Sequence, residues 1–232
     1  MGNNSTSFTE KALQAQNRSA SYGFLAWLFL EGPDRDFIEQ IMMHDEELGA
    51  DALEGEEGSS AILFGLRQIR SYVVHQPGTS IADLCLELGI QRTRLVRGID
   101  PDYGPPPPYE AVFRCPIDCN ESELMLRVQD YYRKAGAQLP PGKRERLDHL
   151  GLELDLMHFM CKEESDLWAD GFRDAAIEMQ QLQRGFLKEH LLVWAPSFCD
   201  AALREPKIGF FHGVVAMLKA FLAEEASTLF ES

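Results

Sequence analysis

Along most of this chain, apolar residues recur at three- and four-residue steps, and this spacing constrains the fold more than any other feature. Such spacing places side chains on one face of an α-helix, and no competing strand-like alternation is present. The expected helices cover residues 16–30, 33–43, 60–76, 81–97, 121–134, 143–161 and 168–193, a short stretch after Pro196, and 209–228. Because each helix needs an apolar partner for its buried face, the pattern predicts an all-α fold, a single multi-helix bundle domain.

A proline-rich segment interrupts this pattern in the middle of the chain. Residues 98–120 contain Pro101, four successive prolines at 105–108, and Pro116, so neither a helix nor a central strand can run through them. We therefore predict a hinge loop at 97–120 between two helical halves of one domain spanning 16–232. Residues 1–15 are predicted to be a flexible N-terminus, and the acidic stretch 49–60 a solvated loop.

Charge excludes one class of partner. The chain has 37 acidic and 22 basic residues and a formal net charge of −15, which would repel a nucleic-acid backbone. The same field would attract a basic peptide, although net charge often serves only solubility. The longest apolar run near the start, Phe24–Leu30, has seven residues, so we expect a cytoplasmic protein without stable membrane association.

The cysteines indicate neither disulfides nor metal. Five cysteines are an odd number in a chain large enough to fold without covalent links, which favours reduced thiols. Cys115 and Cys119 form one close pair, but no second pair stands nearby to complete a tetrahedral zinc site. No metal ligand is therefore predicted.

Polar residues at four-residue spacing mark one helix in the second half. Glu145, His149 and Glu153 would lie one turn apart on the same helix side. Helix capping by Asp148 or Glu145, with ion pairs holding His149, explains this pattern better than catalysis does. An enzyme using Asp148, His149 and Glu153 is an alternative, but no nucleophile motif or glycine-rich phosphate loop accompanies them.

Two motifs resemble one known family. Residues 145–154 are similar to the signature E-P-x-D-H-x-x-x-E-L of the TorD/DmsD/NarJ family of molybdoenzyme-specific chaperones, with Arg146 in place of the proline. Phe186, His190 and Trp194 match the family's F-x-x-x-H-x-x-x-W stretch, in which a packed histidine is the expected role. Residues 107–113 resemble the family's proline–aromatic hinge. The likeness is closest to the TorD/DmsD branch and spans about residues 16–220.

This resemblance implies a function in binding rather than catalysis. Family members are all-helical cytoplasmic chaperones that bind the twin-arginine leader of a molybdopterin oxidoreductase catalytic subunit until its cofactor is inserted and it is exported. A NarJ-like assembly factor for a subunit that is not exported is the alternative. The resemblance implies no resident cofactor, with weak guanine-nucleotide binding and transient contact with the molybdenum cofactor as further possibilities. A monomer or a helix-swapped dimer fits the long hinge.

The leader requires carboxylates for its guanidinium groups and an apolar groove for the remainder. We expect this groove where the hinge meets the start of the helix at Asp148. Asp148 would supply charge, His149 orientation, and two tyrosines apolar contact. The predicted peptide-binding residues are Tyr22, Arg94, Pro108, Tyr109, Asp148, His149 and Glu153.

Overall fold

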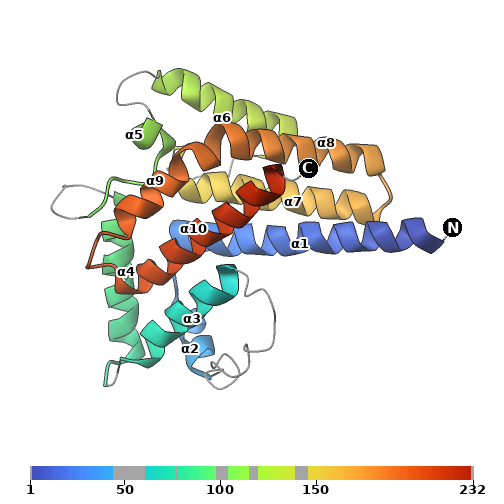
Figure 1. Ribbon diagram of the computed structural model, residues 1–232. Helices are drawn as coiled ribbons and strands as arrows, with labels where there is room; N and C mark the ends of the chain where they lie inside the picture. Colours follow the sequence, from blue (N-terminus) through green and yellow to red (C-terminus); the bar gives the residue numbers. More distant parts are fainter. Residues whose placement is uncertain are drawn as a thin grey trace. The chain divides into compact units, whose positions relative to one another are not determined.

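The structure is a computed structural model that describes residues 2–43, 61–76, 78–97, 104–114, 120–138 and 146–230 (Figure 1). Within these ranges the regular structure is helical and no strand is present, which confirms the all-α prediction. The chain divides into two compact units, Met1–Leu30 with Tyr109–Trp194, and Glu31–Pro108 with Ala195–Ser232. The single-domain organisation and the 97–120 hinge stay predictions.

The first unit is built on three long helices. Helix α1 (Gly2–Leu30) lies along α7 (Leu150–Ala169), and α7 also contacts α8 (Arg173–Phe186), as Figure 1 shows. Helix α6 (Glu121–Ala135) packs on α8, and the short α5 (Glu110–Arg114) precedes it. A π-helical turn, Leu187–Leu191, follows α8 directly and leads into α9 (Leu192–Ala202).

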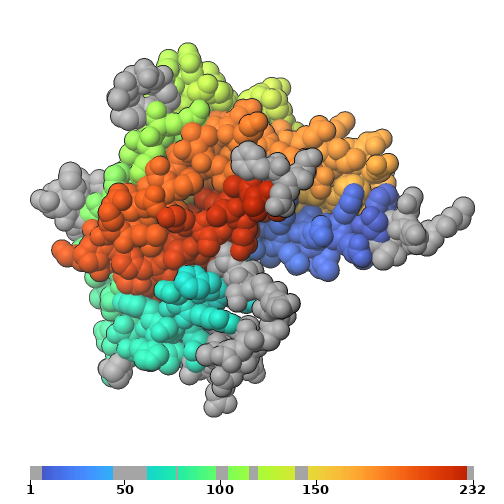
Figure 2. All heavy atoms as spheres, viewed as in Figure 1, coloured from blue at the N-terminus to red at the C-terminus, as the bar shows by residue number. Residues whose placement is uncertain are grey.

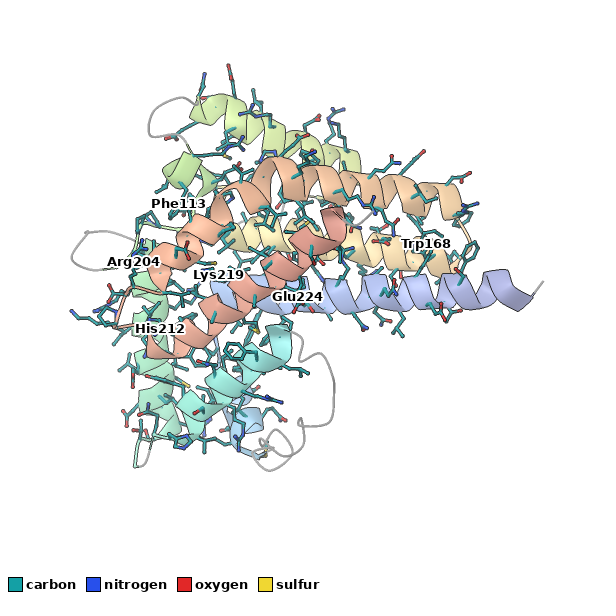
Figure 3. All side chains as sticks on the ribbon, in the orientation of Figure 1. Phe113, Trp168, Arg204, His212, Lys219 and Glu224 are labelled. Carbon is teal, nitrogen blue, oxygen red and sulfur yellow. The ribbon has the colours of Figure 1, made fainter. Side chains whose placement is uncertain are left out.

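Helix α1 begins earlier than its sequence pattern predicts. Residues 2–15, predicted to be flexible, are helical, because this part of α1 has partners on α7. The Phe8 ring lies 5.4 Å from the Trp168 ring, and Lys11 Nζ lies 4.4 Å from the same ring's centroid. The Ser165 hydroxyl donates to the Ala12 carbonyl at 2.9 Å. Figure 3 labels Trp168 on α7, and Figure 2 shows α1 in blue.

Several predicted helix boundaries are wrong. The helix expected at 143–161 begins at Leu150 and runs to Ala169. The helix expected at 168–193 is broken at Gly171, whose φ of +82° lies in the left-handed region that only glycine adopts at low cost. Phe172, placed on the buried stripe by its spacing, is 61% exposed at the new helix start. Pro196, expected to precede a helix, lies inside α9.

The second unit contains α2 (Arg35–Met43), α3 (Ala61–Val74), α4 (Ile81–Arg97), the rest of α9, and α10 (Gly209–Phe230). Helix α10 packs on α3 and α4, and α2 contacts the same two helices. The Ser80 hydroxyl accepts from the Asp83 amide at 3.1 Å and caps the start of α4. The Gln91 side-chain oxygen accepts from the Phe210 amide at 3.0 Å and ties α4 to α10.

Some predictions fall outside the described residues. They concern the loop at 49–60, the pair Cys115 and Cys119, and Glu145 in the polar ladder.

Substitution of Gly65 tests the contact between α3 and α10. A Cβ atom at Gly65 would lie 2.2 Å from Met217 Cβ, so Gly65→Ala should lower the free energy of unfolding by about 1–3 kcal/mol through overpacking. At Gly89, on α4 in the same unit, a Cβ would meet nothing within 4 Å. Gly89→Ala should therefore stabilise the protein by roughly 0.5–1 kcal/mol. Urea denaturation of both variants measures the difference, and equal effects would contradict the close packing.

Candidate functional site

The proline–aromatic segment and the residues before α7 are joined through their backbones. Tyr109 and His149 form an isolated antiparallel bridge, and the Glu110 amide donates to the Asp148 carbonyl at 2.8 Å. The Asp148 side chain adds a third link, because its Oδ2 accepts from the Ala111 amide at 3.1 Å at the start of α5. Asp148 is fully buried, so this link is protected from water. Together these bonds fix residues 109–114 onto the N-terminal end of α7.

His149, rather than Asp148, caps α7. Its backbone is extended, with φ −77° and ψ 133°, and its Nδ1 accepts from the Gly151 amide at 3.1 Å. The helix therefore begins at Leu150, and the expected continuous ladder on one helix is wrong for His149. The sequence pattern favours helix capping by Asp148 or Glu145 over catalysis. The helix is capped, but by His149. The bridge to Tyr109 is the physical reason, since an extended backbone cannot also be helical.

Arg146 neutralises the buried Asp148 carboxylate. Arg146 Nε lies 3.0 Å from Asp148 Oδ1, and Arg146 Nη2 lies 3.0 Å from Asp148 Oδ2, which is the two-point geometry preferred by guanidinium and carboxylate. Arg146 Nη1 also reaches Glu121 Oε2 at 3.1 Å, at the start of α6. The guanidinium carbon lies 5.7 Å from the Tyr109 ring centroid, within cation–π range.

A second buried carboxylate, Glu110, links α5 to the π-helical turn. Its Oε2 is bonded to His190 Nδ1 at 2.8 Å, and its other oxygen accepts from Arg114. Arg114 Nη1 also donates to the Glu189 carbonyl at 2.7 Å. These two contacts tie the first and last residues of α5 to residues 189 and 190 of the π-helical turn.

Glu153 completes the buried acid cluster. It is fully buried on α7, and its Oε2 accepts from Trp194 Nε1 at 3.0 Å. Its other oxygen, Oε1, is buried and has no hydrogen-bond partner among the described residues. Burial, followed by the charge of Glu110, raises the pKa of Glu153 well above its usual range. The uncharged form of Glu153 is therefore favoured. The other two acids have ion-pair partners, Glu110 with Arg114 and Asp148 with Arg146.

Aromatic rings surround His190. Its imidazole stacks on Phe186 at 5.2 Å, and the Tyr131 ring meets it edge-on at 5.4 Å. Phe113, labelled on α5 in Figure 3, lies 5.7 Å from the Trp194 ring. His190 is therefore a packed and hydrogen-bonded side chain, as its spacing predicts.

The predicted site residues separate into three groups. Tyr109, Asp148, His149 and Glu153 come together in the first unit, although only Tyr109 is partly exposed. Tyr22 is fully buried on α1 of the same unit. Arg94 and Pro108 belong to the second unit, where Arg94 Nη1 lies 3.9 Å from Glu205 Oε1.

The motif analysis missed Glu110 and Arg114 as members of this network. Their four-residue spacing was a usable signal, since it allows an ion pair on one helical turn. The prolines before them, however, favoured a loop over a helix.

The described residues contain no group of three or more histidine, cysteine, aspartate or glutamate side chains that could hold a metal ion. None of the helices in the described ranges is long and apolar enough to cross a bilayer. Guanine-nucleotide binding and contact with a molybdenum cofactor stay predictions.

A family model described as "Nitrate reductase delta subunit" matches residues 65–200, more than half of the chain and both motif segments. The chain belongs to this family. A chaperone protein TorD of Vibrio vulnificus strain YJ016 is 28% identical over 115 residues, which are 49% of this chain and 52% of that protein. The match to relatives of the TorD type confirms the predicted resemblance.

Two further relatives of this nitrate reductase delta subunit family are named after other reductases. A perchlorate reductase assembly chaperone of Dechloromonas aromatica strain RCB is 28% identical over 113 residues, covering 48% of this chain and 50% of that protein. A selenate reductase assembly chaperone of Thauera selenatis is 33% identical over 81 residues, covering 35% and 41%. This chain spans about half the length, or less, of the relatives it matches.

Removing the Asp148 carboxylate tests its role as the central link in this family member. Asp148→Ala leaves the buried Ala111 amide unpaired, and should lower the free energy of unfolding by about 2–3 kcal/mol. Asp130→Ala removes an aspartate that pairs with Lys134 on the outside of α6, and should have a much smaller effect because exposed ion pairs contribute little. Guanidinium chloride titrations compare the two, and equal losses would argue against the link.

The raised pKa of Glu153 predicts that the stability of the protein depends on pH. Because the folded state raises the pKa of Glu153, its contribution to stability is complete below the unfolded pKa of about 4.3 and declines as pH rises toward the folded pKa, by up to about 1.4 kcal/mol per pH unit. Glu153→Gln should remove this decline. Glu164→Gln is the control, because Glu164 is also buried on α7 and bonded to a tryptophan, but is further bonded by Gln183. Denaturation at several pH values measures both slopes, and a decline that persists in Glu153→Gln would refute the assignment.

Proposed function

We propose that this chain is a cytoplasmic, non-catalytic chaperone that binds the catalytic subunit of a molybdopterin oxidoreductase through its twin-arginine leader. The observation that carries the proposal is its similarity to proteins named TorD, perchlorate reductase and selenate reductase chaperones, within a shared family. The chaperone would hold the subunit until the cofactor is inserted and export begins.

The state of the carboxyl groups supports binding over catalysis. Both oxygens of Asp148 are bonded to backbone or arginine groups. Glu110 is bonded to His190, and Glu153 accepts from Trp194. His149 uses its Nδ1 to cap a helix. A general acid or base must reach a substrate proton, and these groups are directed at the protein itself. The rival enzyme that uses Asp148, His149 and Glu153 therefore has less support than a binding protein.

Surface contact with a leader would fall to the partly exposed members of the site. Tyr109 offers an aromatic face at the edge of α5, while Asp148, His149 and Glu153 would act by holding that edge in place. Arg94 and Pro108, in the second unit, remain proposed contacts. Tyr22, which is buried on α1, would contribute to leader binding only indirectly, through packing.

Leader binding can be measured with a synthetic peptide of the leader from the reductase subunit that co-purifies with the chain. Tyr109→Ala should weaken the peptide's Kd about tenfold, the effect of losing one aromatic anchor worth about 1.4 kcal/mol. Phe172→Ala is the matched control, since Phe172 is an exposed aromatic at the start of α8. Its Kd should equal that of the wild type.

The site assignment also predicts weaker binding in Asp148→Ala and His149→Ala proteins that retain the helical fold. Unchanged affinity in both would exclude this edge as the leader site. A leaderless subunit that binds as tightly as the full-length one would instead favour the assembly-factor alternative for a subunit that is not exported, which the family's description as a nitrate reductase subunit supports.

A further inference from the structure

The environment of Arg146 has the features of a guanidinium-binding site. Asp148 supplies a carboxylate at 3.0 Å to both Nε and Nη2, and Tyr109 supplies an aromatic face at 5.7 Å. Glu121 supplies a second carboxylate at 3.1 Å. A carboxylate fork, an aromatic ring and a second carboxylate around one cation form a specific receptor for arginine.

Burial indicates that this receptor opens to the surface. The Asp148 side chain is fully buried, while the Arg146 side chain is 43% exposed and that of Glu121 62%. A partly exposed guanidinium therefore pairs with a carboxylate that has no exposed surface of its own. The departure of Arg146 would uncover a buried carboxylate, which requires a replacement cation because an unpaired buried charge is costly.

The sequence adds an independent observation. Arg146 stands where the family signature given above has proline. Because proline has no charged side chain, Asp148 has a cationic partner at position 146 only when arginine stands there. Without Arg146, Asp148 Oδ2 would keep its bond to the Ala111 amide, whereas Oδ1 would lose its partner.

We propose that Arg146 is a tethered occupant of a guanidinium site formed by Asp148, Tyr109 and Glu121, and that an arginine side chain of a bound peptide displaces it. The identity of that peptide as a reductase leader rests on the proposed function, whereas the site itself does not. The tether keeps the occupant at an effective concentration on the order of millimolar, so it competes with any free arginine ligand. A lysine ammonium cannot span both Asp148 oxygens, and the site selects arginine.

L-arginine methyl ester is a suitable probe of the site. Removing the tethered guanidinium in Arg146→Ala should tighten binding of this probe roughly five- to tenfold, as expected for the loss of one internal competitor. Arg133→Ala, which removes an exposed arginine from an ion pair on α6, should leave the Kd unchanged. The affinity of L-lysine methyl ester should increase less in Arg146→Ala than that of the arginine ester. Calorimetric titration measures all of these constants.

Two results in the Arg146→Ala protein would overturn the proposal. The first is an unchanged Kd for the arginine ester. The second is binding that survives Asp148→Asn in the same background, because the probe would then not use the Asp148 carboxylate.

A measurement on the wild-type protein does not depend on the variants. In protein labelled with ¹⁵N-arginine, the Arg146 Nε–H resonance should move toward that of a solvated arginine as unlabelled arginine methyl ester saturates the site. Saturation without this shift would show that the probe binds elsewhere, and would contradict displacement.

The leader peptide distinguishes failure of this inference from failure of the proposed function. If the arginine ester binds Arg146→Ala more tightly but no variant binds the leader, the guanidinium site is supported and the leader is not its ligand. If the leader binds wild type and Arg146→Ala equally and the ester gains no affinity, the chaperone function is supported and Arg146 is not a competitor.

Discussion

The carboxylate of Asp148 is the point on which the first unit's site depends. It lies between two segments that are distant in sequence, and it accepts a hydrogen bond from the Ala111 amide while pairing with Arg146. Its own carbonyl accepts from the Glu110 amide. One fully buried residue thus positions α5, orients an arginine, and leaves the next residue, His149, extended for its role as helix cap. Such a carboxylate is stable only because every oxygen has a partner.

The neighbouring acids require a different form of compensation. Three carboxyl groups are buried within a few residues of two arginines, and a low-dielectric interior does not tolerate the excess negative charge. The raised pKa of Glu153 favours its uncharged form, which reduces the imbalance, and Trp194 donates to its Oε2. The chain's acidic composition does not reveal this arrangement, because surface acids dominate the net charge of −15.

How much of this could be predicted depends on whether local or tertiary forces decide a residue's conformation. The helices α2, α4, α6 and α10 follow apolar periodicity, and the Ser80 cap follows its residue type. The start of α7 does not, because the spacing of Glu145, His149 and Glu153 continues across a point where a bridge to Tyr109 makes the backbone extended. The short helix at Glu110 was hidden by the prolines before it. Both errors arise from contacts made across the sequence.

The same contacts change what the signature motif indicates. Asp148, His149 and Glu153 are buried, so the motif specifies how α5 is held against α7, and it reports architecture more directly than ligand chemistry. Chemistry at the surface then depends on the residues around the motif, which can differ without loss of the fold. Position 146 is such a residue. A proline there would leave the Asp148 carboxylate open to an external cation, whereas Arg146 fills the place with a cation of the chain's own, so a single substitution beside an unchanged core can set how strongly an arginine ligand must bind.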